Sequence, residues 1–317
     1  MQLILKSNLL ITLLLLVVVG VSMSNFLLIW VFMEISTLVF IFIISMDQHS
    51  SGTLSLKYFV TQSFISMIMV ITFLLMDGGM TEFKTLFLSV LSMWKLGVPP
   101  FQNWFMNMIM DSSWFVFFLI STVMKAIPFL LLSIFFSFSA LMVGLFSVLG
   151  PSLMGVSQMC LKKIMGTSSM FTSGWVMISM SSSSLNWLLV FTLYSFMMLA
   201  FCLMISPESM MTPDASYSPS VSDSFIVFFI LLSLSGIPPM SGFFMKIYIL
   251  MSIFMDGHII LATLIVLASS FSVYMYIKNI FKYMALSSLG SSFISMKFSF
   301  FSWGLLLNML SAIILYI

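Results

Sequence analysis

The sequence predicts an all-α polytopic membrane protein with about eleven transmembrane helices. Of its 317 residues, 61% are hydrophobic and only 6% are charged, and the mean hydropathy is +1.21. Such a chain has too little polar surface to cover a soluble globule. Its apolar segments are near the roughly 20 residues that a helix needs to cross a bilayer, and they lack the alternation typical of barrel strands.

The apolar segments define the expected crossings in order. They lie near residues 3–22, 25–46, 56–76, 85–109, 113–137, 139–158, 167–182, 185–206, 223–251, 258–281 and 299–317. The seventh is the shortest. The longest polar stretch, residues 206–224, is rich in Pro and Ser and is too short to fold alone, so we expect a loop there. Residues 1–317 therefore form a single membrane domain.

Two of these segments contain a double proline. Pro99 and Pro100 interrupt the fourth, and Pro238 and Pro239 interrupt the ninth. Proline removes a backbone donor and blocks helix continuation, and carbonyls freed at membrane depth need protein or water to cover them. We expect broken helices that line an interior cavity. The alternative is that the prolines only kink packed helices.

The broken segments occupy matching places in two successive blocks of five. Because five is odd, the second block crosses the membrane in the opposite sense, which is the inverted-repeat plan of ion-coupled transporters. We expect a first repeat over about residues 1–137, a second over about 138–283, and a C-terminal helix over about 299–317.

Four charged residues lie deep in apolar segments, namely Glu34, Lys95, Lys125 and Lys246. A charge at bilayer depth costs roughly 2.5 to 3.5 kcal/mol on insertion scales, so such residues are kept mainly for function. With a rise of about 1.5 Å per residue, the first three lie roughly 14 to 18 Å into their segments, near the midplane. These residues predict an ion or proton pathway, with a static Glu34–Lys95 ion pair as the structural alternative.

The remaining lysines are distributed asymmetrically. With eleven crossings, one side of the membrane holds Lys6, Lys57, Lys162, Lys163, Lys278, Lys282 and Lys297. The positive-inside rule then places the N-terminus inside and the C-terminus outside. Lys6, the apolar run after it and a small-residue site could instead mark a secretory signal, although a spanning helix fits the lysine pattern equally well.

No motif for an electron-carrying cofactor or a metal occurs in the sequence. Cys160 and Cys202 are isolated, and His49 and His258 fall in expected loops. Neither a phosphate-binding loop nor a dinucleotide fingerprint is found. We therefore expect this chain to bind no cofactor, no metal and no nucleic acid.

Five stretches carry a resemblance to a known family. They are LKYFVTQSF (56–64), WKLGVPPFQNWF (94–105), STVMKAIPFLLL (121–132), GVSQMCLKKIMGTSSMFTSGWVMISM (155–180) and LSGIPPMSGFFMK (234–246). In this order they resemble the family of NADH dehydrogenase subunit 2, the antiporter-like membrane subunits of respiratory complex I. The chain also has no arginine, which resembles the bias of a thymine-rich animal mitochondrial genome.

The resemblance implies a role for each buried charge. Glu34 would pair with Lys95 on the first broken helix, Lys125 would connect onward, and Lys246 would pass protons to the far channel. The family commonly has His where Gln102 stands, so a relay role at that position is in doubt.

The resemblance also implies a setting. The chain would be a proton-translocating subunit of NADH:ubiquinone oxidoreductase in the mitochondrial inner membrane, with the N-terminus in the matrix and the C-terminus in the intermembrane space. Its neighbours would be lipids and other membrane-arm subunits, including other antiporter-like ones. NADH, FMN, iron–sulfur clusters and ubiquinone would belong to other subunits. A stand-alone monovalent cation/proton antiporter of the related family is the alternative.

Overall fold

The structure, a computed structural model, describes residues 2–47, 52–75, 81–136, 138–158, 160–182, 186–204, 230–238 and 240–288. These residues form α-helices, one short 3₁₀ turn and connecting turns, without a strand among them. The chain divides into two compact units, Met1–Ser147 and Val148–Ile317. The predicted helix at 299–317 lies outside the described residues.

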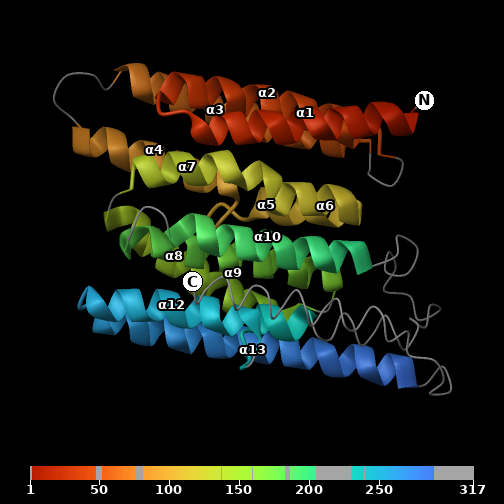
Figure 1. Ribbon diagram of the computed structural model, residues 1–317, viewed down its shortest axis with the longest axis vertical. Coiled ribbons are helices and arrows are strands. Elements are labelled where there is room, and N and C mark those ends of the chain that lie inside the picture. The colour runs from red at the N-terminus through yellow and green to blue at the C-terminus, as the bar shows by residue number, and fades with distance from the viewer. Residues whose placement is uncertain are drawn as a thin grey trace. The chain divides into compact units, whose positions relative to one another are not determined.

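The first unit is built from helices that pack side by side (Figure 1). They are α1 (Gln2–Ser22), α2 (Phe26–Ser45), α3 (Leu54–Leu75), α4 (Thr81–Leu96), α5 (Asn103–Asp111), α6 (Trp114–Ser121), the 3₁₀ turn η1 (Val123–Lys125), α7 (Ala126–Ile134) and the first half of α8 (Phe138–Ser157). Helix α2 contacts α1 and α3, and α4 contacts α3 and α7. The segment from α6 to α7 is the most buried of the long apolar spans.

The second unit is organised around α9 (Leu161–Ser182), which contacts α10 (Asn186–Met204) and α12 (Ser241–Met255). Every residue from 164 to 180 in α9 is buried, so this helix forms the centre of the unit. A short helical stretch covers residues 230–235, and α13 (Ile259–Ser288) packs against α12.

Two helices differ from the sequence prediction. Helix α9 begins at Leu161, not near residue 167, and its first turn contains Lys162 and Lys163. The prediction placed the start too late because the two lysines lower the hydropathy of this turn, although the turn is helical. The predicted crossing at 113–137 is interrupted at Thr122 and η1. Pro128 explains this second difference, because its ring conflicts with the carbonyl four residues earlier and its backbone has no N–H to donate.

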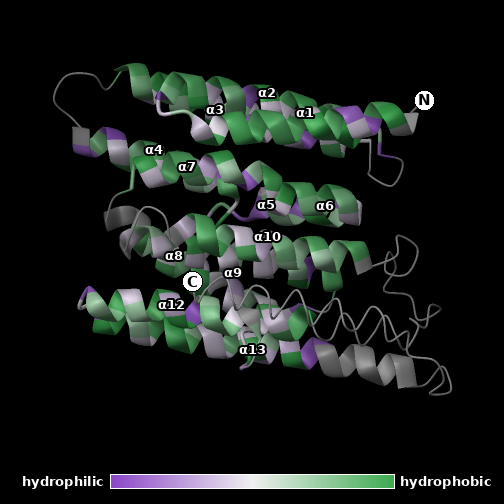
Figure 2. Cartoon of the chain, in the orientation of Figure 1, coloured by the Kyte–Doolittle hydropathy of each residue, from purple (hydrophilic) through white to green (hydrophobic). Residues whose placement is uncertain are grey.

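The surface of the helices suits a lipid environment. Five helices in the described part of the chain are long and apolar enough to cross a membrane. Figure 2 shows hydrophobic residues along α1, α2 and α3. Hydroxyl side chains inside the helices donate to carbonyls of their own helix, as Ser36 does to Met33 and Ser92 to Ser89. These bonds satisfy polar groups that water cannot reach at membrane depth.

Candidate functional site

The first predicted break lies between α4 and α5, where the chain turns at Gly97. The φ angle of Gly97 is 69°, a left-handed conformation that glycine adopts without a steric penalty. A Cβ at this position would lie 2.7 Å from the Cβ of Phe105, so the turn also needs a residue without a side chain. The indole Nε1 of Trp104 donates to the carbonyl of Trp94 over 3.1 Å. This bond occupies one of the carbonyls near the break, so α4 can end inside the protein.

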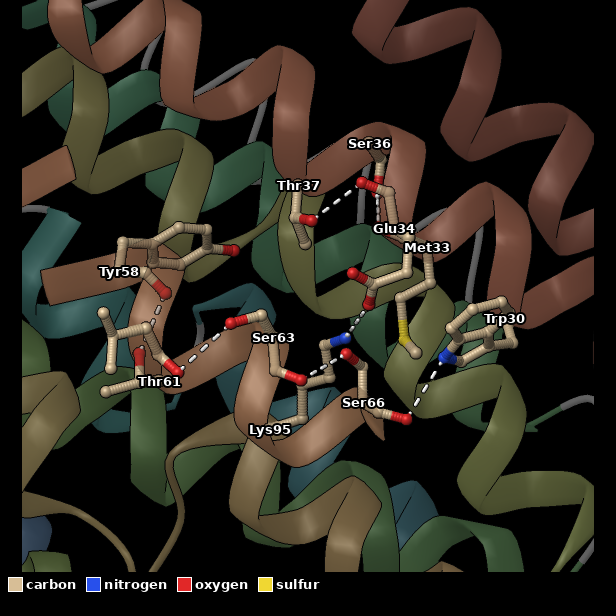
Figure 3. Close-up of polar contacts among 11 residues, drawn as sticks. Trp30, Met33, Glu34, Ser36, Thr37, Tyr58, Thr61, Ser63, Ser66 and Lys95 are labelled. Atoms are coloured by element: carbon tan, nitrogen blue, oxygen red, sulfur yellow. Dashed lines mark hydrogen bonds and ion pairs between the residues drawn. The ribbon is translucent and has the colours of Figure 1, made fainter. Parts of the chain in front are cut away.

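The predicted ion pair lies at the end of α4. Lys95 Nζ is 3.3 Å from Glu34 Oε1 on α2, a contact drawn as a dashed line in Figure 3. The Lys95 side chain is only 2% exposed, whereas the Glu34 side chain is 25% exposed. The pair therefore joins a fully buried cation to a carboxylate at the edge of the unit.

Lys125 lies at the unpredicted interruption between α6 and α7. Thr122 leaves helical geometry with φ −122° and ψ −77°, and its hydroxyl donates to the carbonyl of Phe118 over 2.6 Å. Lys125 is 3% exposed and its Nζ lies 4.6 Å from the centre of the Phe105 ring. A cation over an aromatic face gains electrostatic stabilisation, which increases when water is excluded.

Lys246 is associated with the second break, in the second unit. Gly236, with φ 78°, ends the stretch 230–235, and Lys246 Nζ donates to the carbonyl of Ser235 beside it. Lys246 is 7% exposed and its Nζ lies 5.3 Å from the centre of the Phe171 ring on α9. A side-chain donor thus occupies a carbonyl at this break too. Pro238 is in the turn, while the predicted role of Pro239 falls outside the described residues.

Within the first unit, Lys95 and Lys125 line one internal cavity. The two lysines come from different interrupted helices, so the breaks bring them to a common interior space. No cluster of three or more His, Cys, Asp or Glu residues that could hold a metal occurs in the parts of the chain that the structure describes. His258 is exposed in the turn between α12 and α13, as the sequence indicated.

Several contributors to this site were absent from the sequence interpretation. They are all aromatic: Trp104, which donates to Trp94, Phe105 and Phe171, which lie beside the lysines, and Tyr58 on α3. The chain has 35 Phe, 8 Tyr and 7 Trp, so aromatic residues are too common for these few to stand out in the sequence. Pro128 was the only signal for the break beside Lys125.

The interrupted helices, each with a buried lysine close to the break, define a helical membrane protein that holds charged side chains in its interior. The model of the family described as NADH:quinone oxidoreductase/Mrp antiporter, TM, matches residues 23–272. The chain belongs to this family and, within it, to the NADH-ubiquinone oxidoreductase chain 2 group, which confirms the predicted resemblance.

Individual relatives agree with this placement. NADH-ubiquinone oxidoreductase chain 2 of Artemia franciscana is 31% identical over 258 residues, which cover 81% of this chain and 82% of the relative. The protein of that name from Anopheles gambiae is 27% identical over 274 residues, covering 82% and 80%. A chain of respiratory complex I from Thermus thermophilus has the same fold, with a TM-score of 0.73 at 18% identity, covering 92% of this chain and 74% of that one.

Proposed function

We propose that this chain is a proton-translocating membrane subunit of NADH:ubiquinone oxidoreductase, respiratory complex I. It takes part in the enzyme without a redox centre of its own, and couples electron transfer elsewhere in the complex to proton movement through Glu34, Lys95, Lys125 and Lys246. The observation that carries this proposal is the Glu34–Lys95 ion pair at the end of α4, whose lysine is buried and lines the same cavity as Lys125.

The pair has the features that proton transfer needs. A cation that is 2% exposed depends on its carboxylate for stabilisation, because desolvation disfavours the charged form. A small change in the separation of Lys95 and Glu34 therefore alters proton occupancy strongly. Lys125, held over an aromatic ring, provides a second site for the proton inside the same unit. Lys246 provides a site in the second unit.

Family membership supports the proposed setting. The chain resides in the mitochondrial inner membrane as a multi-pass protein, among lipids and other membrane-arm subunits that include further antiporter-like ones. NADH, FMN, iron–sulfur clusters and ubiquinone are bound by other subunits.

The architecture completes the proposal. About eleven crossings form two inverted repeats, residues 1–137 and 138–283, with a final crossing at 299–317. Three features support it: both predicted breaks turn at a glycine with positive φ, both have a side-chain donor on a carbonyl near the turn, and both lie close to a buried lysine.

Isolation of the native assembly tests the proposal. We expect the chain to migrate in mild detergent with a very large complex that oxidises NADH, and reconstituted particles to pump protons during that reaction. Recovery as a free monomer or small oligomer that exchanges cations for protons would contradict the complex I proposal and favour the stand-alone antiporter.

Two ion pairs support the proposed orientation of the first unit. Lys6 near the start of α1 lies 3.0 Å from Asp47 after α2, and Lys57 near the start of α3 lies 2.7 Å from Asp111 at the end of α5. The short connection from α2 to α3 places both pairs at the same end of the unit. That end would face the matrix, because positively charged residues are retained on the inner side.

Cysteine labelling tests this orientation. Gly52, between α2 and α3, and Asp256, between α12 and α13, are both exposed. We expect a membrane-impermeant thiol reagent to modify Gly52→Cys only from the matrix side and Asp256→Cys only from the intermembrane side. The starting variant lacks Cys160 and Cys202. Labelling of both positions from one side would refute the eleven-helix arrangement.

A further inference from the structure

The cavity shared by Lys95 and Lys125 also receives two polar side chains from α3. Tyr58 and Gln62, one turn apart, line this cavity and are 2% and 3% exposed. Residues four apart lie on the same face of a helix, so both face the cavity from one side. Neither residue is charged, so neither stood out in the sequence as the buried charges did.

The position of Tyr58 is fixed by its aromatic neighbours. Its ring makes an edge contact with Phe40 at 5.0 Å and lies 6.5 Å from the ring of Trp104. Figure 3 shows its hydroxyl end turned toward the side of the interior that holds Glu34. A buried tyrosine hydroxyl normally finds a hydrogen-bond partner, and a leucine or phenylalanine would fill the same space without that need.

The size of the cavity limits what it can hold. Its volume is about 10 Å³, enough for the centre of one water molecule. Buried water typically makes about three hydrogen bonds to polar groups, and the residues that line this cavity include Lys95, Lys125, Tyr58 and Gln62. An apolar ligand of any size is excluded by the same dimensions.

We propose that Tyr58 and Gln62 hold one ordered water molecule between Lys95 and Lys125, and that this water carries the proton from one lysine to the other. This inference rests on the proposed function and adds α3 to the pathway. Tyr58 and Gln62 are positioning residues, because they orient the water and do not themselves change protonation state.

The hydrogen-bond inventory of the water balances in this arrangement. The water accepts from the Lys95 ammonium and from the Tyr58 hydroxyl, and donates to the neutral Lys125 amine and to the Gln62 carbonyl oxygen. Transfer breaks one N–H bond of Lys95 and forms a new O–H bond on the water. The water then loses one of its original O–H bonds as a new N–H bond forms on Lys125. Lys95 becomes neutral, Lys125 becomes the cation, and the water is regenerated.

The test uses the assembled complex with Tyr58→Phe, Gln62→Met and the double variant. Each single change removes one hydrogen bond to the water, worth about 1.4 kcal/mol when a polar group loses its partner, so the rate of coupled proton pumping should fall about tenfold. The matched control is Tyr274→Phe, which removes the same oxygen from a tyrosine on α13 that is 55% exposed. We expect wild-type pumping in that control.

Two further measurements separate positioning from packing. An experimental map of the wild-type complex should contain a water between Lys95 and Lys125 that is missing from Gln62→Met, and pumping in D₂O should show an altered solvent isotope effect in both single variants. A wild-type map without that water, or wild-type pumping in the assembled double variant, overturns the inference. If Lys95→Met stops pumping while the double variant pumps normally, the proposed function stands and only this inference fails.

Discussion

Replacing Lys95 by Met is expected to abolish coupled proton pumping in the assembled complex. The side chain of Lys95 is 2% exposed and contacts Glu34 at 3.3 Å. Met fills nearly the same volume but has no group that can bind or release a proton. The fold should tolerate the change, because the apolar side chain no longer has to be desolvated as a cation, and the carboxylate left without its partner is 25% exposed. The loss should therefore appear in proton transfer and not in assembly.

Replacing Glu34 by Gln should produce a similar loss by a different route. Removing one partner of a buried pair leaves an uncompensated charge and costs about 3 to 5 kcal/mol in fully buried cases. The 25% exposure of Glu34 places this site toward the lower end of that range. The protonated form of Lys95 is then disfavoured. The double variant should lose little beyond either single one, because residues that act as a unit are not additive.

The measurement is the number of protons pumped per NADH oxidised in reconstituted membranes. Lys57→Met is the matched control: it removes a lysine from an ion pair of 2.7 Å whose side chains are 51% and 35% exposed. Exposed pairs contribute about 0 to 1 kcal/mol, so pumping should be unchanged. Wild-type proton yield in assembled Lys95→Met would leave the buried pair with a structural role only.

Replacing Gly236 by Ala is the second change with a large expected effect. A Cβ at Gly236 would lie 2.9 Å from both the Cδ and the Nζ of Lys246, so the methyl group must displace the ammonium from the carbonyl of Ser235. The displaced group is the end of a flexible side chain, and the helices themselves need not move. We expect proton pumping to fall severalfold while assembly is retained.

Two other glycines separate this contact from backbone strain. Gly257 has φ 80°, close to that of Gly236, but a Cβ there would meet no atom within 4 Å. Gly52 also has open space around it. Ala at Gly257 reproduces the left-handed strain of about 1 to 2 kcal/mol, and Ala at Gly52 serves as a neutral reference. Equal losses in Gly236→Ala and Gly257→Ala would assign the effect to strain and not to Lys246.

The charged part of the site was predictable because charge is rare in this chain. Each of Glu34, Lys95, Lys125 and Lys246 stands out in a long apolar segment, and the energetic cost of that position signals a function. The prolines and glycines at 97–100 and 236–239 likewise marked two of the breaks. The proximity of Glu34 to Lys95, however, depends on how α3 and α7, which both contact α2 and α4, place these two helices, and the spacing along the chain did not determine that packing.

The polar and aromatic part of the site was not predictable in the same way. Tyr58 and Gln62 are ordinary in an amphipathic position near the start of a helix, and only the packing of α3 against α4 and α5 makes them line a cavity. The start of α9 was misplaced because it was predicted from hydropathy, which measures lipid solubility and not helical geometry. Lys162 and Lys163 lower the hydropathy of the first turn but do not prevent it from being helical.

The exposure of Glu34 has a consequence for the life of the free polypeptide. Along α2, the residues on the same face are apolar and exposed, including Leu27, Val31, Leu38 and Phe42. An unassembled copy would thus present a carboxylate to lipid tails at a depth where charge is poorly tolerated. Burial of this face of α2 against another protein surface would remove that cost, so the free polypeptide should be less stable in the bilayer than the assembled one.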